Sequence, residues 1–126
     1  MVHGTFCWNE LNTRNAEAAM KFYGDTVGWT FDAMEMDNGE PYYVCMQGDT
    51  PVGGIFTMIG SEFTGVPEHW FAYLAVDDVD KRINKAKANG ATIVREPFDI
   101  PTVGRIAIVQ DPEGAVMGWM TPAPQS

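Results

Sequence analysis

The sequence predicts an α+β fold built from two βαβββ modules that form curved mixed sheets. Apolar residues alternate in several short segments, which is typical of strands, and recur at helical spacing in two others. The order strand, helix and three strands occurs twice. The two helix-to-strand junctions, at Gly28 and Gly90, lie about 62 positions apart. This repeat indicates duplicated units that bury their apolar faces together.

Length and composition indicate one domain, residues 1–126, because the chain has 126 residues of which 45% are hydrophobic. The formal net charge of -9 argues against binding of nucleic acid, whose phosphates need a basic face. No signal peptide and no membrane-spanning segment is visible. Cys7 and Cys45 are isolated in apolar strands, which favours reduced thiols over a disulfide or redox pair. We therefore expect a cytoplasmic protein.

The first module, about residues 4–58, opens with a strand at Thr5–Leu11. Thr13 or Asn15 can cap the following helix, and Gly24 and Gly28 bring it to an end. Three strands complete the module, over Trp29–Met36, Tyr42–Gln47 and Val52–Met58, with a turn at Asp37-Asn38-Gly39. Gly53-Gly54 inside the last strand indicates a close backbone approach or a bulge.

The second module, about residues 69–121, follows a polar linker at 59–68 that contains two glycines and a proline. It begins with a strand at His69–Val76. Asp77, Asp78 and Asp80 mark the start of a helix, where the dipole favours negative charge. That helix carries an apolar stripe of Val79, Ile83 and Ala86 and ends at Gly90, and a strand follows at Thr92–Glu96.

A hairpin closes the second module around Asp111-Pro112-Glu113-Gly114, which has the residue pattern of a type I turn. If Asp111 lies opposite Gly114, then Val109 faces Val116. Alternation would then give the hairpin an apolar face that suits a covering helix, with Ile106, Ile108, Met117 and Trp119. The other face is mixed and hollow, with Arg105, Ala107, Val109, Val116, Gly118 and Met120. A sheet with one covered and one hollow face suggests a ligand cleft.

Four motifs carry a resemblance to the vicinal oxygen chelate superfamily of glyoxalases, bleomycin-resistance proteins and extradiol dioxygenases. They span residues 19–29, 75–79, 88–91 and 111–115, and include Phe22-Tyr23 with Gly28-Trp29. The chain is most similar to glyoxalase-like members that share its Trp-x-Glu-Leu start. The resemblance covers nearly the whole chain and implies two half-barrels, each a curved sheet with its helix outside.

The resemblance also implies four inward positions that hold a metal ion in the family's enzymes. They fall on Trp8, on Gly54 or a neighbour, on Phe71 with His69 one inward step away, and on Gly118. A divalent ion needs several nitrogen or oxygen ligands. Tryptophan and glycine side chains supply none, so we expect no metal and no other cofactor.

Two charged residues and several aromatic ones are expected to face inward. Glu10 and Arg105 form either a ligand-contacting pair, with Glu10 as base and Arg105 as a carboxylate anchor, or an ion pair that fixes the sheet. Trp8, Phe71 and Tyr73 either stack a flat ligand or fill the space of the absent metal. His3 and His69 are expected at the surface.

These features indicate a metal-independent small-molecule-binding protein that holds its ligand in the sheet cleft. The expected lining is Trp8, Glu10, Phe71, Tyr73, Arg105 and Met120. The alternative is a glyoxalase-like lyase or isomerase, which would use Glu10 as base or a divalent metal through other ligands. A homodimer is expected, because one module forms only half a barrel and C2 symmetry is the commonest among soluble oligomers.

Overall fold

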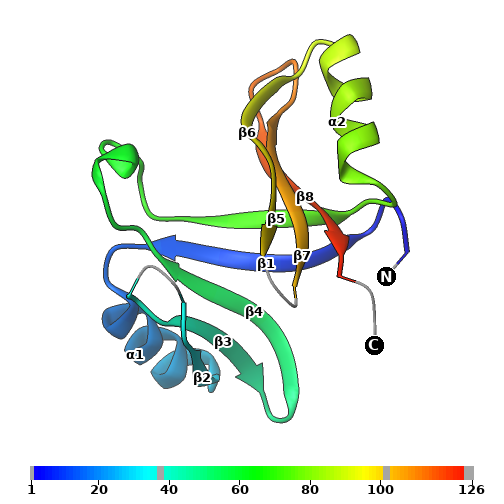
Figure 1. Ribbon diagram of the computed structural model, residues 1–126. Coiled ribbons are helices and arrows are strands. Elements are labelled where there is room, and N and C mark those ends of the chain that lie inside the picture. Colours follow the sequence, from blue (N-terminus) through cyan, green and yellow to red (C-terminus); the bar gives the residue numbers. More distant parts are fainter. Residues whose placement is uncertain (1, 37–38, 101–102, 124–126) are drawn as a thin grey trace. The chain divides into compact units, whose positions relative to one another are not determined.

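The computed structural model describes residues 2–36, 39–100 and 103–123 (Figure 1). The chain divides into an N-terminal unit, residues 8–71, and a C-terminal unit, residues 72–126 with residues 1–7. Strand β1 (Phe6–Thr13) and strand β5 (His69–Ala75) each begin in one unit and end in the other. The boundaries between the two compact units therefore lie inside β1 and β5. The sequence pattern predicts a single boundary in the linker at 59–68.

The N-terminal unit contains the strands β2 (Thr30–Met34), β3 (Tyr42–Gln47) and β4 (Thr50–Thr57) beside β1, in the order β2-β3-β4-β1. The pairs β2–β3 and β3–β4 are antiparallel, and β4 runs parallel to β1 with Glu10 opposite Gly54. The strand prediction is therefore confirmed for this module. The predicted turn at Asp37-Asn38-Gly39 has two residues outside the described part of the chain.

Helix α1 (Ala16–Val27) has clear start and end signals. The Asn15 side chain accepts a hydrogen bond from the backbone N–H of Ala18 (3.0 Å), so Asn15 and not Thr13 is the cap. Gly28 ends the helix in a left-handed conformation (φ 82°), and its N–H donates to the carbonyl of Tyr23. Gly24 lies inside the helix, so its predicted role as a terminator is wrong.

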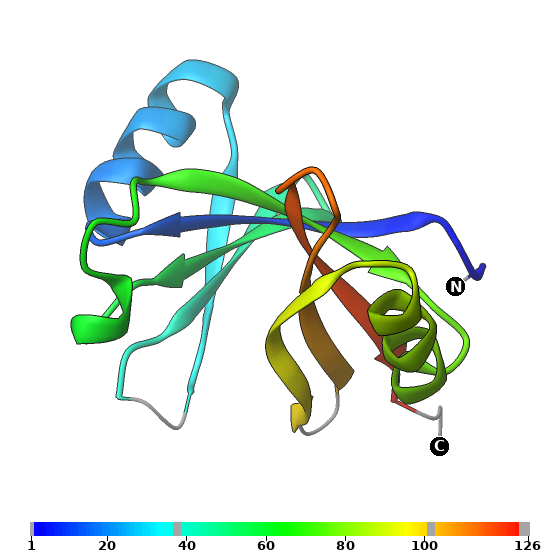
Figure 2. The ribbon, with the colours of Figure 1, turned by 90° about the horizontal axis from the view of Figure 1, so that it is seen from above.

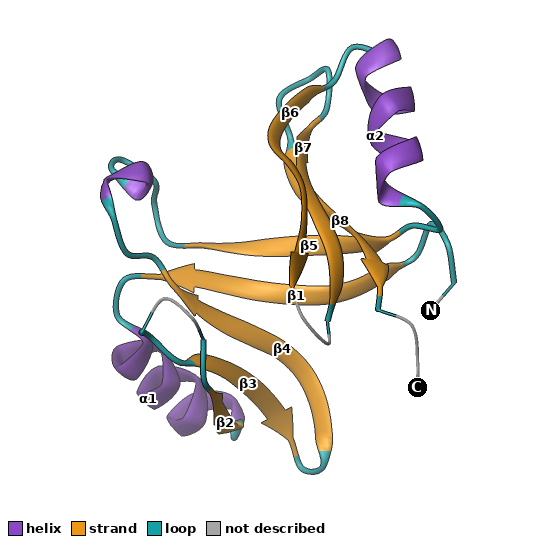
Figure 3. Cartoon of the chain, in the orientation of Figure 1, coloured by secondary structure: helices purple, strands orange, loops and turns teal. Residues whose placement is uncertain are grey.

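Helix α1 packs beside the strands of the N-terminal unit (Figure 3). The core between them consists of Leu11, Ala16, Cys45 and Ile55, which are all buried. Burial of such side chains stabilises the unit by roughly 1.5–3 kcal/mol for each large aliphatic one. Because side chains alternate along a strand, Leu11 under the helix places Trp8 and Glu10 on the face away from α1.

The segment at 59–68 is held against the start of α1. It contains a short 3-10 helix, Ser61–Phe63. The Glu68 carboxylate accepts hydrogen bonds from the Arg14 backbone N–H (2.7 Å), the Arg14 guanidinium (2.6 Å) and the Thr13 hydroxyl (2.9 Å). The Arg14 backbone N–H contributes most to holding the pKa of Glu68 below its usual value. The C-terminal end of the predicted linker is thus fixed to the start of α1 through Glu68.

The C-terminal unit has the strand order β5-β8-β7-β6, with β6 (Thr92–Ile100), β7 (Gly104–Gln110) and β8 (Val116–Pro122). Helix α2 (Val79–Ala88) packs on these strands (Figure 2). Its N-cap is Asp78, whose carboxylate accepts from the Lys81 N–H (3.2 Å). Neither helix in the described residues is long and apolar enough to cross a membrane.

The core under α2 confirms the predicted helix stripe but not the predicted hairpin face. Val79, Ile83 and Ala86 of the helix are buried against Ala107 and Val109 of β7, with Trp119 and Leu74 packed beside them. The prediction assigned Ala107 and Val109 to the opposite, hollow face. That assignment is wrong.

Ala107 and Val109 lie on the α2 face because of the way the Asp111–Gly114 turn closes. The Gly114 N–H donates to the Asp111 carbonyl (3.0 Å) as expected, but the Asp111 N–H donates to the Ala115 carbonyl (2.8 Å). Gly114 is left-handed (φ 103°), which is the geometry of a type I turn followed by a bulge. Gln110 therefore faces Val116, and the pairing of β7 with β8 is shifted by one residue from the prediction. A one-residue shift moves side chains to the other face.

Candidate functional site

The face of the N-terminal unit away from α1 gathers the candidate site residues of that unit. Trp8, Glu10 and Asn12 come from β1, and Tyr42 and Gly54 come from β3 and β4. Trp8, Glu10 and Tyr42 are partly exposed, whereas Asn12 is buried. The side chains of this face are therefore only partly buried, so that a ligand could reach them.

At the centre of this face, the Trp8 indole Nε1 donates a hydrogen bond to the Tyr42 hydroxyl (2.9 Å). The Tyr42 ring crosses the sheet above Gly54, and a Cβ built on Gly54 would overlap the hydroxyl and ring of Tyr42. Only glycine leaves room for this arrangement. The predicted close approach at Gly53-Gly54 is thus confirmed: the Asn9 carbonyl approaches Gly53, and the Tyr42 side chain approaches Gly54. The predicted bulge is also present, because the pairing with β3 shifts register between Gly53 and Pro51.

Polar groups adjoin this aromatic pair along β1. The Asn12 amide Nδ2 lies 3.4 Å from the Glu10 carbonyl and 3.5 Å from the Glu10 carboxylate, in donor geometry. Glu10 stands opposite Gly54 in the sheet. On β5, the rings of His69 and Phe71 meet edge to face with centroids 6.1 Å apart. The site thus offers aromatic surface with one carboxylate beside it.

The positions at which the resemblance implies metal ligands carry few side chains that could bind a metal ion. In this unit they are Trp8, Gly54 or a neighbour, and Phe71 with His69 one inward step away, and Tyr42 lies over Gly54. Gly118 of β8 carries no side chain. Among the described residues, no three His, Cys, Asp or Glu side chains lie close enough together to hold a metal. A divalent ion would need ligands that these positions do not offer.

In the C-terminal unit, Arg105 lies on the α2 face and not on the predicted hollow face. Its guanidinium binds both carboxylate oxygens of Asp80 on α2 (2.7 and 3.2 Å) and one of Asp99 on β6 (3.1 Å). These hydrogen bonds raise the pKa of Arg105 and lower that of Asp80. The one-residue shift of the hairpin explains this correction, and it leaves Arg105 engaged by its own unit.

Met120 and Tyr73 keep the predicted orientation. Leu74 and Trp119 pack on the α2 core, so their neighbours Tyr73 and Met120 point to the other face of the sheet. Met120 is buried opposite Ile106 of β7. Of the six residues expected to line the cleft, five therefore lie on the expected face of their own unit.

Sequence reasoning missed Tyr42 as a site residue, although Gly54 carried the signal. A glycine inside a strand indicates that something approaches closely. The partner could not be identified from the sequence, because it depends on the pairing of β3 with β4, which has a register shift at Cys45 and Met46.

Two βαβββ units, each with a helix packed on its strands, define the class of glyoxalase-like folds, and comparison with known proteins is consistent with this. The model of the Glyoxalase/Bleomycin resistance protein/Dioxygenase superfamily matches residues 5–117. The chain belongs to this superfamily.

Two curated relatives are similar over most of this chain. "Putative glyoxylase CFP32" of Mycobacterium tuberculosis is 45% identical over 122 residues, which are 97% of this chain and 46% of the relative. "Anthracycline biosynthesis protein DnrV" of Streptomyces peucetius is 28% identical over 125 residues, with 89% and 45% covered. The chain thus spans about half the length of each of these relatives.

Among solved structures, methylmalonyl-CoA epimerase from Mycobacterium tuberculosis has the same fold. Its TM-score is 0.67 with 15% sequence identity, and the match covers 98% of this chain and 94% of that one. At this identity the likeness concerns the fold alone.

Proposed function

We propose that this protein binds a small molecule without a metal ion, on the face that carries Trp8 and Tyr42. The observation that supports this most is the Trp8–Tyr42 hydrogen bond above Gly54. The resemblance implies that Trp8 and Gly54 stand at positions that would hold a metal ion, and here an aromatic pair lies over them. The result is an aromatic platform, and aromatic platforms hold ligands by stacking and apolar burial.

A flat aromatic ligand suits this platform best. Trp8 and Phe71 supply ring surface, and Glu10 supplies a negative charge that would favour a cationic group on the ligand. The relative named for anthracycline biosynthesis adds support, because anthracyclines are flat polycyclic molecules. Arg105 is left out of the proposed contacts because Asp80 and Asp99 hold it.

The test is an NMR titration with doxorubicin, a flat cationic anthracycline, in buffer that contains EDTA. We expect the indole N–H signal of Trp8 to shift, and the Trp8→Leu variant to bind about five- to tenfold more weakly, as expected when a stacking contact worth ~1–1.5 kcal/mol is lost. Trp70→Phe is the matched control, because Trp70 lies on the α1 side, where it bonds Tyr23. Equal binding by the Trp8→Leu and Trp70→Phe variants would contradict the proposal, as would binding that EDTA abolishes.

A glyoxalase-like lyase or isomerase is the second candidate, because the CFP32 relative is named as a glyoxylase and Glu10 lies beside the aromatic pair. A carboxylate there could remove a proton from a carbon next to a carbonyl group. Exchange of deuterium from solvent into such substrates, present with wild-type protein and absent with Glu10→Gln, would favour this candidate. No exchange with either protein would leave binding as the function.

We also propose that the protein acts as a homodimer in the cytoplasm. The relatives are about twice as long as this chain, so two copies would match one relative in length. The cysteines at positions 7 and 45 are both free thiols, which suits a reducing compartment.

A further inference from the structure

A hollow of about 320 Å³ lies in the C-terminal unit between α2, the start of the chain and the sheet. We call it the α2 hollow; it is lined by His3, Gly4, Leu74, Val76, Arg82, Lys85, Ala86, Asn89 and Trp119. Its volume is near the lower end of the range for small-molecule sites, roughly 300–1,000 Å³. It lies on the α2 side of the sheet, away from the face of Met120.

The wall of the α2 hollow is apolar. Leu74 and Trp119 belong to the layer packed against the α2 core, and Val76 and Ala86 are part of that core. The indole Nε1 of Trp119 is buried and has no hydrogen-bond partner among the described residues. A buried donor without a partner is uncommon and calls for an explanation. The Trp119 ring lines the hollow, whereas its Nε1 is closed off from solvent.

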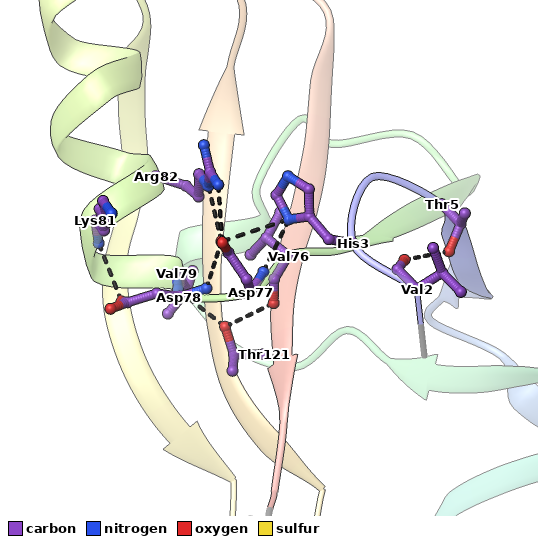
Figure 4. A network of polar contacts seen from close by, with 10 residues as sticks. All are labelled: Val2, His3, Thr5, Val76, Asp77, Asp78, Val79, Lys81, Arg82 and Thr121. Atoms are coloured by element: carbon purple, nitrogen blue, oxygen red, sulfur yellow. Dashed lines mark hydrogen bonds and ion pairs between the residues drawn. The ribbon is translucent and has the colours of Figure 1, made fainter.

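Basic side chains form the rim of the α2 hollow, although the chain as a whole is acidic. Arg82 and Lys85 lie one turn apart on α2, and both line the hollow. The Asp77 carboxylate holds the Arg82 guanidinium by two hydrogen bonds of 2.8 Å (Figure 4). Lys85, by contrast, has no ion-pair partner in the part of the chain that the structure describes.

His3 closes the rim from the start of the chain. Its Nδ1 accepts a hydrogen bond from the Asp77 backbone N–H (2.9 Å), and Figure 4 shows His3, Asp77 and Arg82 joined in one network. Gly4 is tied to β5 by the hydrogen bond from its N–H to the Ala75 carbonyl (2.7 Å). Hydrogen bonds therefore hold His3 and Gly4 in place at the rim of the hollow.

We propose that the α2 hollow is a second binding site, which takes a small carboxylic acid with an apolar body. The apolar body lies against Leu74, Ala86 and Trp119, and the carboxylate lies at Lys85. A single unpaired ammonium group matches a single negative charge, and a charge-assisted hydrogen bond beside an apolar wall is stronger than one in open water.

The test uses hexanoate as the probe and hexanamide as its neutral analogue, each titrated into the full chain and followed by NMR. We expect saturable shifts of the Trp119 indole N–H and the Ala86 amide. We expect the Lys85→Gln variant to bind hexanoate about tenfold more weakly, which corresponds to one charge-assisted contact. Lys87→Gln is the matched control, because Lys87 lies on the same helix outside the hollow, near Glu96.

Three results would overturn this proposal. One is the absence of shifts at Trp119 and Ala86 up to millimolar hexanoate. Another is equal binding of hexanamide, which would remove the role of the basic rim. The third is an equal effect of the substitutions at Lys85 and Lys87. The aliphatic probe and its reporters keep this result separate from doxorubicin binding at Trp8, so either proposal can fail alone.

Discussion

Gly54 is the residue on which the proposed site depends most directly. Its missing side chain lets the Tyr42 ring lie across the sheet and meet Trp8. Tyr42 and Trp8 are 34 positions apart in the sequence, so their contact exists only because β4 separates β1 from β3 in the sheet. The geometry of the site therefore depends on the missing side chain at Gly54 and on the order of the strands in the sheet.

Replacing Gly54 with Ala should displace Tyr42 and break its hydrogen bond to Trp8. We expect a loss of about 1–3 kcal/mol in the free energy of unfolding, typical of overpacking, together with a shift of the Trp8 indole signal. Denaturant unfolding and NMR give the two readings. In a Tyr42→Ala background the same change should cost less, with a coupling above ~0.5 kcal/mol. Additive costs would show that Tyr42 does not lie over Gly54.

Cys45 should be chemically inert in the folded protein. It is fully buried under α1, and burial raises the pKa of its thiol to about 11. The reactive thiolate is therefore scarce at pH 8. Iodoacetamide at pH 8 should leave Cys45 unmodified by mass spectrometry until denaturant is added, whereas rapid native modification would contradict its burial. Because the folded pKa is raised above the ordinary 9.0, this thiol's contribution to stability is lost as pH rises from about 9 to 11.

At the scale of elements, the sequence predicted the helices and most strands correctly but placed one strand on the wrong face. Strand existence follows from local alternation, and helix ends follow from local caps such as Asn15 and Gly28. The face of β7 depends on how the Asp111–Gly114 turn closes. Turn residues alone do not show whether Asp111 pairs with Gly114 or with Ala115. In the structure the bulge at Gly114 makes Asp111 pair with Ala115, which sets the register of β7 against β8.

The corrected position of Arg105 leads to a prediction about Asp80. In Arg105→Gln, the pKa of the Asp80 carboxyl should rise toward its ordinary value of 3.8, measured by carbon-13 NMR titration. A lowered folded pKa contributes stability that is present above the unfolded value and is lost as pH falls through the folded value. Wild-type protein should therefore lose more stability in acid than the variant does.

The matched control for that experiment is Arg95→Gln. Arg95 lies over the Phe98 ring on β6, 3.6 Å from its centroid, and has no ion pair among the described residues. This control should leave the Asp80 titration unchanged. An Asp80 pKa that is the same in wild type and Arg105→Gln would place Arg105 back on the opposite face.

At the scale of the whole molecule, superfamily membership and the α+β fold were predictable from the sequence, because they rest on a repeat and on local motifs. The site was only partly predictable. Alternation predicted the strand face of Trp8, Glu10 and Phe71, whereas Tyr42 and the α2 hollow depend on contacts between distant segments. The compact units of the structure also begin inside strands, which local signals do not reveal.

We expect the chain to form a homodimer. Large apolar side chains are exposed on the N-terminal unit, among them Phe22 (58%), Val27 (54%) and Trp70 (42%), and such groups favour association. Sedimentation over a dilution series should give twice the chain mass of 13.9 kDa at micromolar concentration. Doxorubicin should strengthen the dimer if both chains contribute to its site. A monomer that binds doxorubicin at high concentration would contradict this prediction.

Elemental analysis of protein purified without a chelator distinguishes metal-independent binding from binding through a metal ion. The resemblance implies metal ligands at Trp8, Gly54 and Phe71, and Tyr42 lies over Gly54 and accepts a hydrogen bond from Trp8. We predict far less than one Zn, Ni, Mn or Fe per chain, and doxorubicin binding that is unchanged after dialysis against EDTA. About one divalent ion per chain, lost on dialysis together with binding, would show that the protein binds its ligand through a metal ion.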